Sequence, residues 1–240
     1  MEGKNIVIVG GNSGIGKATA ELLKAQGANL YLYSKSGVGT TGLDTSSDFE
    51  EMPGLPEVID GVVYAPGTIN LKPFHRISVD DFKKEMEVNF FGNIALAKAV
   101  LPIFRTQKAG QFLVVSSIAG KFGFHLRSAY SASKHALFGY FESLVMEESD
   151  YNLKVTVACP GKINTPISTN AVTGEGKAHG QMDHNQATGM PVDVCVQQLL
   201  NALVKNKHEV LIGNKELMAV HLKRFFPRLF WKIIPKQSAT

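Results

Sequence analysis

The stretch NIVIVGGNSGIGKATAELLKAQGA, residues Asn5–Ala28, decides the fold of this chain. It opens with a short apolar run, Ile6–Val9, rich in the β-branched residues that are typical of a buried strand. Glycines follow at once, and apolar residues then recur at helical spacing through Leu22 and Leu23 up to Gly27. The stretch therefore predicts a strand, a glycine turn and a helix, which is the opening unit of an α/β sheet.

The same alternation continues along the rest of the chain, so we expect a mainly parallel sheet with helices on both faces. Ligands of such sheets bind at the carboxyl ends of the strands. Little helical periodicity is present between residues 37 and 56, so we expect a short strand there and no full crossover helix. Further strands are expected within 29–34, 59–67, 110–117, 153–161 and 208–213, and further helices within 78–107 (two helices joined near Gly92, the first capped by Ser78), 128–149 and 192–205.

The totals limit the class of protein. The chain has 240 residues, of which 44% are hydrophobic and 19% charged, and its net charge is +4. These values predict one globular domain over residues 1–240 and give no reason to expect a nucleic-acid partner. The two cysteines, Cys159 and Cys195, predict no disulfide framework, and we expect no signal peptide in the N-terminal segment. No apolar run approaches the ~20 residues of a membrane span, so we expect a cytoplasmic protein.

The glycine turn has the pattern GxxxGxG, formed by Gly10, Gly14 and Gly16. Gly10 permits a tight turn, Gly14 allows backbone amides to approach a pyrophosphate, and Gly16 allows close helix packing. The N–H groups at the start of the helix attract phosphate. We therefore expect a dinucleotide site, although a glycine turn without a ligand is the alternative. The candidate contacts in this turn are Gly10, Asn12, Ser13, Gly14, Ile15 and Gly16.

The end of the second predicted strand bears on the choice of dinucleotide. NAD sites commonly place a carboxylate there to bind the ribose 2′-hydroxyl. This chain has Ser34, Lys35 and Ser36 instead, a cation between two hydroxyls that suits a 2′-phosphate. The sequence thus favours NADP(H) over NAD(H). The alternative is that Lys35 is an ordinary solvated lysine.

The segment SAYSASKHAL, residues 128–137, places Tyr130 and Lys134 four residues apart on one helix face. The pKa of a free tyrosine is about 10, and a neighbouring ammonium lowers the pKa of a phenol. We therefore expect a proton-transfer pair, with an exposed helix surface as the alternative. Ser117, at the end of the fifth predicted strand, could bind a substrate oxygen, or it could simply cap a turn. Asn89 could hold a relay water with its side chain, or it could simply bend the helix.

Five motifs give the chain a resemblance to the short-chain dehydrogenase/reductase family. They follow in the family's order: the glycine turn, VNFFGN with Asn89, VVSSIAG with Ser117, YSASK with Tyr130 and Lys134, and CPGKINT at residues 159–165. The resemblance implies a Rossmann-like, doubly wound parallel sheet flanked by helices. It also implies a catalytic tetrad of Asn89, Ser117, Tyr130 and Lys134. The cofactor contacts that it implies are Asp44, Thr45, Ala65, Pro66, Gly67, Tyr130, Lys134 (on the nicotinamide ribose), Pro160, Gly161, Ile163 and Thr165.

The sequence departs from the family pattern at two places. Val9 replaces the usual Thr before the first glycine, and YAPG, residues 64–67, replaces NNAG. We expect packing to replace the family's hydrogen bonds there.

Two segments are expected to border the substrate. Residues 166–190 predict a polar lid, whose His179, Asp183 and His184 are better interpreted as loop residues than as metal ligands. Residues 214–240 form a basic, aromatic tail that could be a flap over an apolar pocket, a subunit contact or a foot on a membrane surface. Pro227 should interrupt any helix in the tail. Both segments resemble the branch of 11-beta-hydroxysteroid dehydrogenase-like and retinoid-type enzymes, which implies an apolar carbonyl or alcohol substrate.

Together these features predict an NADP(H)-dependent oxidoreductase that interconverts a carbonyl and a secondary alcohol. The resemblance also implies a homodimer or homotetramer built on the helices of residues 90–107 and 128–148. Two rivals remain: a dinucleotide-binding sensor or scaffold without catalysis, and an NAD-preferring enzyme of the same fold.

Overall fold

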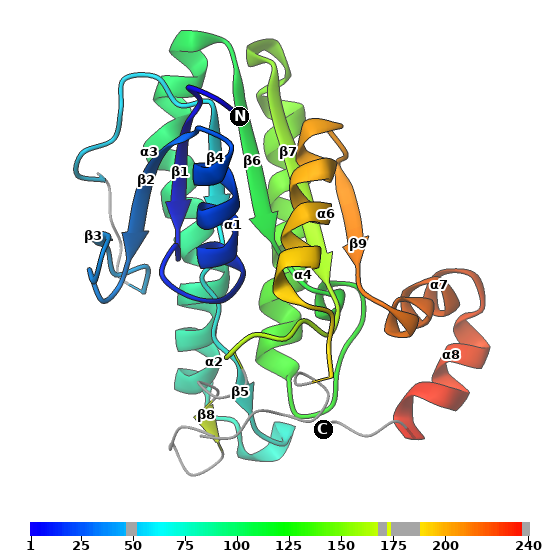
Figure 1. Cartoon of the computed structure of the whole chain (residues 1–240). Coiled ribbons are helices and arrows are strands. Elements are labelled where there is room, and N and C mark those ends of the chain that lie inside the picture. The colour runs from blue at the N-terminus through cyan, green and yellow to red at the C-terminus, as the bar shows by residue number, and fades with distance from the viewer. Residues whose placement is uncertain (47–51, 168–171, 174–187, 237–240) are drawn as a thin grey trace.

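A parallel sheet of seven strands forms the centre of the computed structural model, which describes residues 1–46, 52–167, 172–173 and 188–236 (Figure 1). The strand order is β3-β2-β1-β4-β6-β7-β9, and every neighbouring pair is parallel. The bounds are β1 Asn5–Val9, β2 Asn29–Ser34, β3 Thr41–Gly42, β4 Gly61–Tyr64, β6 Gly110–Val115, β7 Leu153–Pro160 and β9 Glu209–Ile212. The expected doubly wound parallel sheet is confirmed.

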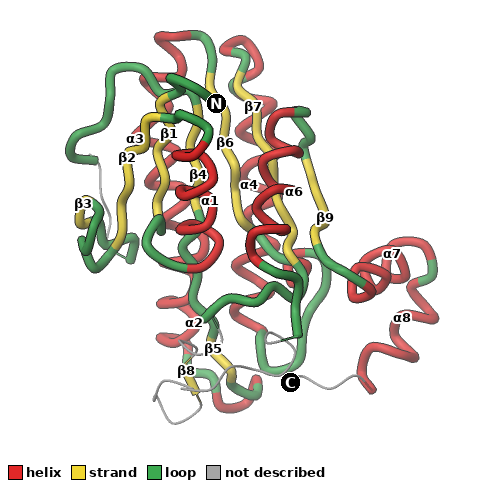
Figure 2. Tube along the Cα trace, viewed as in Figure 1, coloured by secondary structure: helices red, strands yellow, loops and turns green. Residues whose placement is uncertain are grey.

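Helices cover both faces of this sheet (Figure 2). On one face α1 (Gly14–Ala25) and α6 (Val192–Val204) pack on Ile6 and Ile8. On the other face α3 (Gly92–Gln107) and α4 (Ser128–Glu147) pack on Val7 and Val9. The alternate residues of β1 thus enter two separate cores, which explains why this strand is apolar at successive positions.

The helical stretch from Val79 to Gln107 has a wider turn in its middle. Helix α2 (Val79–Met86) begins at Ser78 in a capping box with Asp81, as expected. A π-helical turn, η2 (Glu87–Phe91), then leads into α3, so the two predicted helices meet at Gly92 without a loop. Asn89, one of the predicted site residues, lies in this turn, and π-helical turns are frequent at functional sites.

The same stretch corrects one expectation from the sequence. Val79–Gln107 spans 29 residues and contains an 18-residue window with a mean hydropathy of 1.2, which is long and apolar enough to cross a membrane by length and composition. The expectation that no segment approaches this length was wrong. The apolar side chains Leu96, Val100 and Phe104 of this helix are fully buried against the sheet, so the core of the fold accounts for its composition.

Two short strands were not predicted from the sequence. Strand β5 (Asn70–Leu71) pairs in parallel with β8 (Val172–Thr173), beyond the carboxyl ends of the main strands. This pairing ties the segment after β7 to the loop after β4. Short 3₁₀ turns occur at η1 Phe74–Arg76, η3 Ile118–Gly120, η4 Ser149–Tyr151, η5 Lys215–Leu217 and η6 Ile234–Lys236.

The chain ends in two short helices that stand beside the sheet (Figure 1). Helix α7 (Met218–Phe225) ends before Pro227, and α8 (Pro227–Ile233) begins at this proline. Proline fits the first position of a helix because the N–H that it lacks has no helical partner there. The interruption expected at Pro227 is confirmed. Between β2 and β4 the described residues hold the short strand β3 and no helix, whereas residues 47–51 lie outside the description.

Candidate active site

A cavity of about 740 Å³ lies at the carboxyl ends of the central strands. Its lining falls into three groups. One is the glycine turn and the loop after β4, the second is the ends of β6 and β7 with the start of α4, and the third is an apolar wall from α7 and α8. The place agrees with the rule that parallel sheets bind ligands at this edge.

The glycine turn forms one wall because its backbone is tightly packed. Gly10 has φ +82°, and a Cβ atom on Gly16 would lie only 2.1 Å from the carbonyl oxygen of Gly10. A side chain cannot fit at either place, so the turn leaves backbone exposed for a phosphate group. Gly10, Ser13, Gly14 and Ile15 line the cavity. This cradle fits the pyrophosphate of a dinucleotide.

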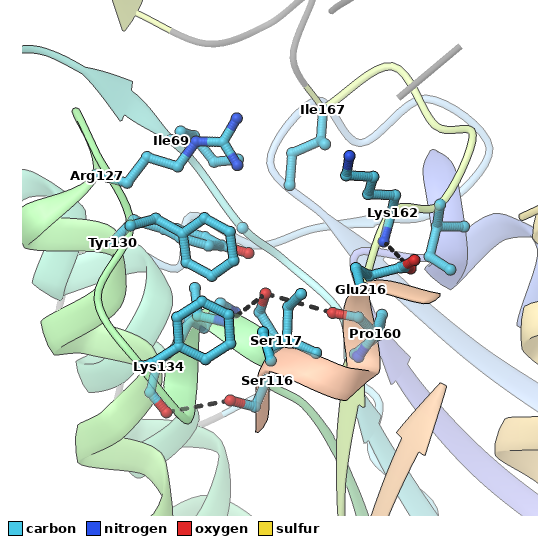
Figure 3. A pocket seen from close by; sticks show the side chains of 18 of the residues that line it. Ile69, Ser116, Ser117, Arg127, Tyr130, Lys134, Pro160, Lys162, Ile167 and Glu216 are labelled. Atoms are coloured by element: carbon cyan, nitrogen blue, oxygen red, sulfur yellow. Dashed lines mark hydrogen bonds between the residues drawn. The ribbon is translucent and has the colours of Figure 1, made fainter. Parts of the chain in front are cut away.

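The predicted proton-transfer residues Ser117, Tyr130 and Lys134 lie close together in the wall of the cavity (Figure 3). Tyr130 and Lys134 come from the first turns of α4, and Ser117 comes from the end of β6. The Oγ of Ser117 accepts a hydrogen bond from the N–H of Ala119 at 3.1 Å and lies 3.4 Å from the carbonyl oxygen of Pro160. Ser117 is also in hydrogen-bonding contact with the Tyr130 phenol.

The electrostatics of the pair differ from the expectation. Burial raises the pKa of the Tyr130 phenol, although the hydrogen bond with Ser117 and the charge of Arg127 oppose this effect. The Nζ of Lys134 lies 5.8 Å from the centre of the Tyr130 ring and donates to the carbonyl of Val115 at 2.9 Å. The expected lowering of the phenol pKa by Lys134 is therefore wrong for this structure, because burial dominates. Burial also lowers the pKa of Lys134, to about 8.

Asn89 lies in the π-helical turn and is fully buried. Its Oδ1 accepts from the N–H of Thr68 at 2.9 Å, and its Nδ2 donates to the carbonyl of Thr68 at 3.0 Å and to Ser133 Oγ at 3.1 Å. The side chain is free of the helix ladder, as expected. However, it is committed to Thr68 and Ser133, so a water held by this side chain is not what the geometry favours. Asn89 instead fixes the loop after β4 beside α4.

The predicted contacts with the nicotinamide half of the cofactor gather at the cavity. Ala65, Pro66 and Gly67 follow β4. Pro160, Gly161, Ile163 and Thr165, at and after the end of β7, line it as well.

The predicted contacts for the adenine half lie outside the lining of the cavity, beyond the end of β2. Lys35 forms an ion pair with Asp44 at 3.0 Å, and both side chains are exposed. The pKa of Asp44 is lowered to about 2, mainly by hydrogen bonds from Ser46 and also by Lys35. Ser36 Oγ accepts from Asn12 Nδ2 at 2.8 Å. Two further predicted contacts are buried. Ser34 Oγ lies 2.6 Å from Thr40 Oγ1, and Thr45 is in hydrogen-bonding contact with Tyr64.

Comparison with known proteins identifies the family. The family model described as short chain dehydrogenase matches residues 49–176. Dehydrogenase/reductase SDR family member 7B of Mus musculus is 33% identical over 97% of this chain and 80% of its own length. Dehydrogenase/reductase SDR family protein 7-like of Drosophila melanogaster is 28% identical over 99% of this chain and 81% of its own.

The chain belongs to the short-chain dehydrogenase/reductase family. It is an NAD(P)-dependent oxidoreductase that acts on CH–OH groups. Two solved structures share the fold at low identity. A short-chain dehydrogenase from Burkholderia cenocepacia in complex with NADP has a TM-score of 0.82 at 19% identity, covering 98% of this chain and 99% of its own. A short-chain dehydrogenase/reductase from Burkholderia phymatum in complex with NAD has a TM-score of 0.75 at 18% identity, covering 100% and 97%.

The dehydrogenase departs from its family pattern at Tyr64, and the structure gives the reason. Tyr64 ends β4 fully buried, and its hydroxyl donates to the carbonyl of Val88 in the π-helical turn at 2.6 Å. Burial raises the pKa of this phenol well above its ordinary value. Tyr64 is packed in the core, as expected, and supplies a hydrogen bond as well.

Sequence reasoning missed two charged residues, Arg127 in the wall of the cavity and Glu85 buried behind it. Arg127 lines the cavity beside Tyr130 (Figure 3). Glu85 of α2 is only 2% exposed, accepts from the N–H of Asn70 at 3.2 Å, and interacts electrostatically with Arg127, Tyr130 and Lys134. Burial raises the pKa of Glu85 to about 8. Two signals pointed to them: Arg127 lies three residues before Tyr130, and Glu85 lies one helical turn before Asn89.

A further contact joins the end of the chain to the cofactor loop. Glu216 of η5 accepts from the N–H of Lys162 at 3.0 Å and from the N–H of Asn214 at 3.1 Å. Within the described ranges, no group of three His, Cys, Asp or Glu side chains is placed to hold a metal. His179, Asp183 and His184 lie outside those ranges, as does most of the predicted lid.

Proposed function

We propose that this enzyme interconverts an apolar carbonyl compound and the matching secondary alcohol with NADP(H). The observation that carries the proposal is the position of Tyr130 and Ser117. They line one cavity together with the phosphate cradle of the glycine turn and the apolar side chains of α7 and α8. A substrate carbon–oxygen group beside these two hydroxyls would share the cavity with the cofactor cradle and with an apolar wall.

The protonation state of Tyr130 suits the acid role. Because burial raises its pKa, the phenol is neutral at physiological pH and can donate a proton to a carbonyl oxygen. Ser117 can donate a second hydrogen bond to the same oxygen. When bound, the nicotinamide supplies or takes up the hydride. Lys134 is fixed by a hydrogen bond to the carbonyl of Val115 and would bind the ribose of the nicotinamide.

The cofactor preference rests on the loop after β2. This segment holds the cation Lys35 and the hydroxyl of Ser36, which suit a 2′-phosphate, and no carboxylate, whereas the Ser34 hydroxyl is buried against Thr40. NAD(H) remains a second candidate because of Asp44, whose carboxylate pairs with Lys35 and could accept from a ribose hydroxyl instead. The proposal holds that Lys35 exchanges Asp44 for the phosphate when NADP(H) binds.

Titration of the Lys35→Ala enzyme with both cofactors tests this preference. We expect NADPH binding to weaken about 10-fold or more, because one charge-assisted contact is lost, with NADH little changed. Asp44→Asn is the matched variant and should bind NADPH at least as tightly as the unaltered enzyme. Equal losses for both cofactors in Lys35→Ala would refute the 2′-phosphate assignment.

The remaining parts of the proposal concern the cellular compartment, the oligomeric state and the size of the substrate. The free, buried thiols of Cys159 and Cys195 suit a reducing compartment such as the cytoplasm. Phe91 and Met146, exposed on η2 and α4, suit a homodimer or homotetramer built on α3 and α4. The resemblance to 11-beta-hydroxysteroid dehydrogenase-like and retinoid-type enzymes agrees with the apolar wall and supports a bulky substrate.

A panel of ketones, from small and water-soluble to bulky and apolar, tests the reaction itself by following NADPH oxidation. We expect turnover, with KM falling as the apolar part of the ketone grows. The rival is a sensor or scaffold that binds the cofactor without catalysis. Tight NADPH binding with no turnover of any ketone, and none of the matching alcohols with NADP⁺, would favour that rival.

A further inference from the structure

The C-terminal arm, which we define as Met218–Lys236, has two different faces. Its inner face is anchored to the body of the enzyme. Phe230 is 1% exposed and packs edge-on against Phe122, with ring centres 5.4 Å apart, and Lys223 donates to the carbonyl of Lys121 at 2.7 Å. The arm therefore has a fixed place beside the sheet, where Figure 1 shows it projecting from the rest of the molecule.

The outer face of the arm is apolar and positively charged. Large apolar side chains that a folded core would bury are 47–64% exposed here: Phe225, Phe226, Leu229 and Trp231. Between them lie exposed cations, Arg224, Arg228, Lys232 and Lys236. From Met218 to the end of the sequence there is no Asp or Glu. Aromatic side chains among basic ones, without acids, match the interface of an anionic lipid membrane.

The rim of the cavity belongs to the same surface. Phe225, Phe226 and Ile233 line the cavity, yet they are 64%, 64% and 39% exposed. Side chains that face both the chamber and the outside form its mouth. The apolar chamber thus opens among the exposed aromatic residues of the arm.

We propose that the arm docks the mouth of the active-site cavity onto an anionic lipid surface, from which the substrate enters without crossing water. The substrate part of this inference rests on the proposed function. Charge favours lipid over a second copy of the chain. In a two-fold dimer the same surface meets itself, so the cations of one arm would face the cations of the other.

Co-sedimentation of the full chain with vesicles tests the docking without any substrate. The probes are neutral phosphatidylcholine vesicles and vesicles in which part of this lipid is replaced by phosphatidylserine. We expect binding to the anionic vesicles, weakened by salt. Arg228→Gln/Lys232→Gln should weaken it roughly 30-fold, since each surface cation contributes about fivefold. Leu229→Ser/Trp231→Ser should abolish it.

The controls separate docking from folding and from catalysis. Phe74→Ser/Val204→Ser changes two exposed apolar residues away from the arm and should leave vesicle binding unchanged. The four altered arm residues do not line the cavity, so each variant should keep NADPH binding and turnover of a small water-soluble ketone.

Two results would overturn the inference. One is that the intact enzyme binds neither vesicle at low salt. The other is that Leu229→Ser/Trp231→Ser leaves vesicle binding intact, or instead splits an oligomer into smaller species, which would make the arm a subunit contact. Vesicle binding without turnover of any ketone or alcohol would contradict the proposed function and would still support the docking surface.

Discussion

Burial, more than any neighbouring charge, sets the protonation states at the centre of this active site. It raises the pKa of Tyr130 and Glu85 and lowers that of Lys134. All three shifts favour the neutral form, as expected of groups removed from water. The sequence predicted the positions of Tyr130 and Lys134 from their spacing. It could not predict these shifts, because the depth of burial depends on α2, which the chain places against α4 from more than 40 residues away.

Glu85 makes a pH-dependent contribution to stability. Its pKa is about 8 in the folded enzyme, against 4.5 without the fold, so the unfolded chain releases the proton first as pH rises. The free energy of unfolding should therefore fall between these two values. Glu85→Gln should remove this cost and be more stable than the unaltered enzyme at pH 8, by about 1 kcal/mol or more, with a smaller difference near about pH 5.

Urea denaturation at several pH values measures this difference. Glu142→Gln, an exposed carboxylate on α4, is the matched control and should show no such trend. If Glu85→Gln is the less stable protein at pH 8, the carboxyl is held in its charged form by its neighbours and the assignment of a neutral Glu85 is wrong.

Among the elements, the π-helical turn η2 connects the sheet to the catalytic helix. The hydroxyl of Tyr64, at the end of β4, donates a hydrogen bond to the carbonyl of Val88 in the turn. Asn89, also in the turn, forms hydrogen bonds with Thr68 and Ser133. The sequence predicted the strands and the main helices well, because apolar periodicity is a local signal. It predicted a join near Gly92 but not a π-helical turn, because that turn depends on hydrogen bonds between residues some 20 or more positions apart.

Removal of the Tyr64 hydroxyl tests this connection. Tyr64→Phe leaves the carbonyl of Val88 without its partner and should cost about 1–2 kcal/mol of stability. It should also lower kcat/KM, since the turn positions Asn89 and the loop after β4. Tyr33→Phe, which loses a hydrogen bond to the carbonyl of Pro53, is the comparison and should lower stability without the same loss of activity. Equal activity in the two variants would show that the turn does not support catalysis.

Across the whole molecule, the carboxyl edge of the sheet gathers residues from nearly the entire chain. The cavity is lined from Gly10 in the first turn to Ile234 in the last. Motif order allowed the nicotinamide side of this site to be predicted. The adenine side was less predictable, because Asp44 and Thr45 form contacts with Lys35 and Tyr64 that no spacing rule reveals. The sequence allowed three roles for the C-terminal tail: a flap, a subunit contact or a membrane foot. In the structure, residues of α7 and α8 in this tail line the cavity.

Phe230 holds the C-terminal arm in place. Truncation of the Phe230 side chain should therefore impair the binding of large substrates more than that of small ones. Phe230→Ala removes a ring buried against Phe122 and should weaken the docking of the arm by about 3 kcal/mol. We expect KM for a bulky apolar ketone to rise at least 10-fold, with KM for a small ketone little changed. Trp231→Ala, at an exposed neighbour, is the control. A uniform loss for both ketones would mean that the arm does not form the substrate wall.

The central claim is that the Tyr130 phenol gives its proton to a carbonyl in the cavity beside bound NADPH. Single-turnover oxidation of NADPH by a saturating ketone, measured in the unaltered enzyme and in Tyr130→Phe, tests it most directly. The account predicts a rate lower by about 10²–10⁴-fold in the variant, with NADPH binding unchanged. A variant that binds NADPH and turns over within a few-fold of the unaltered rate would contradict it.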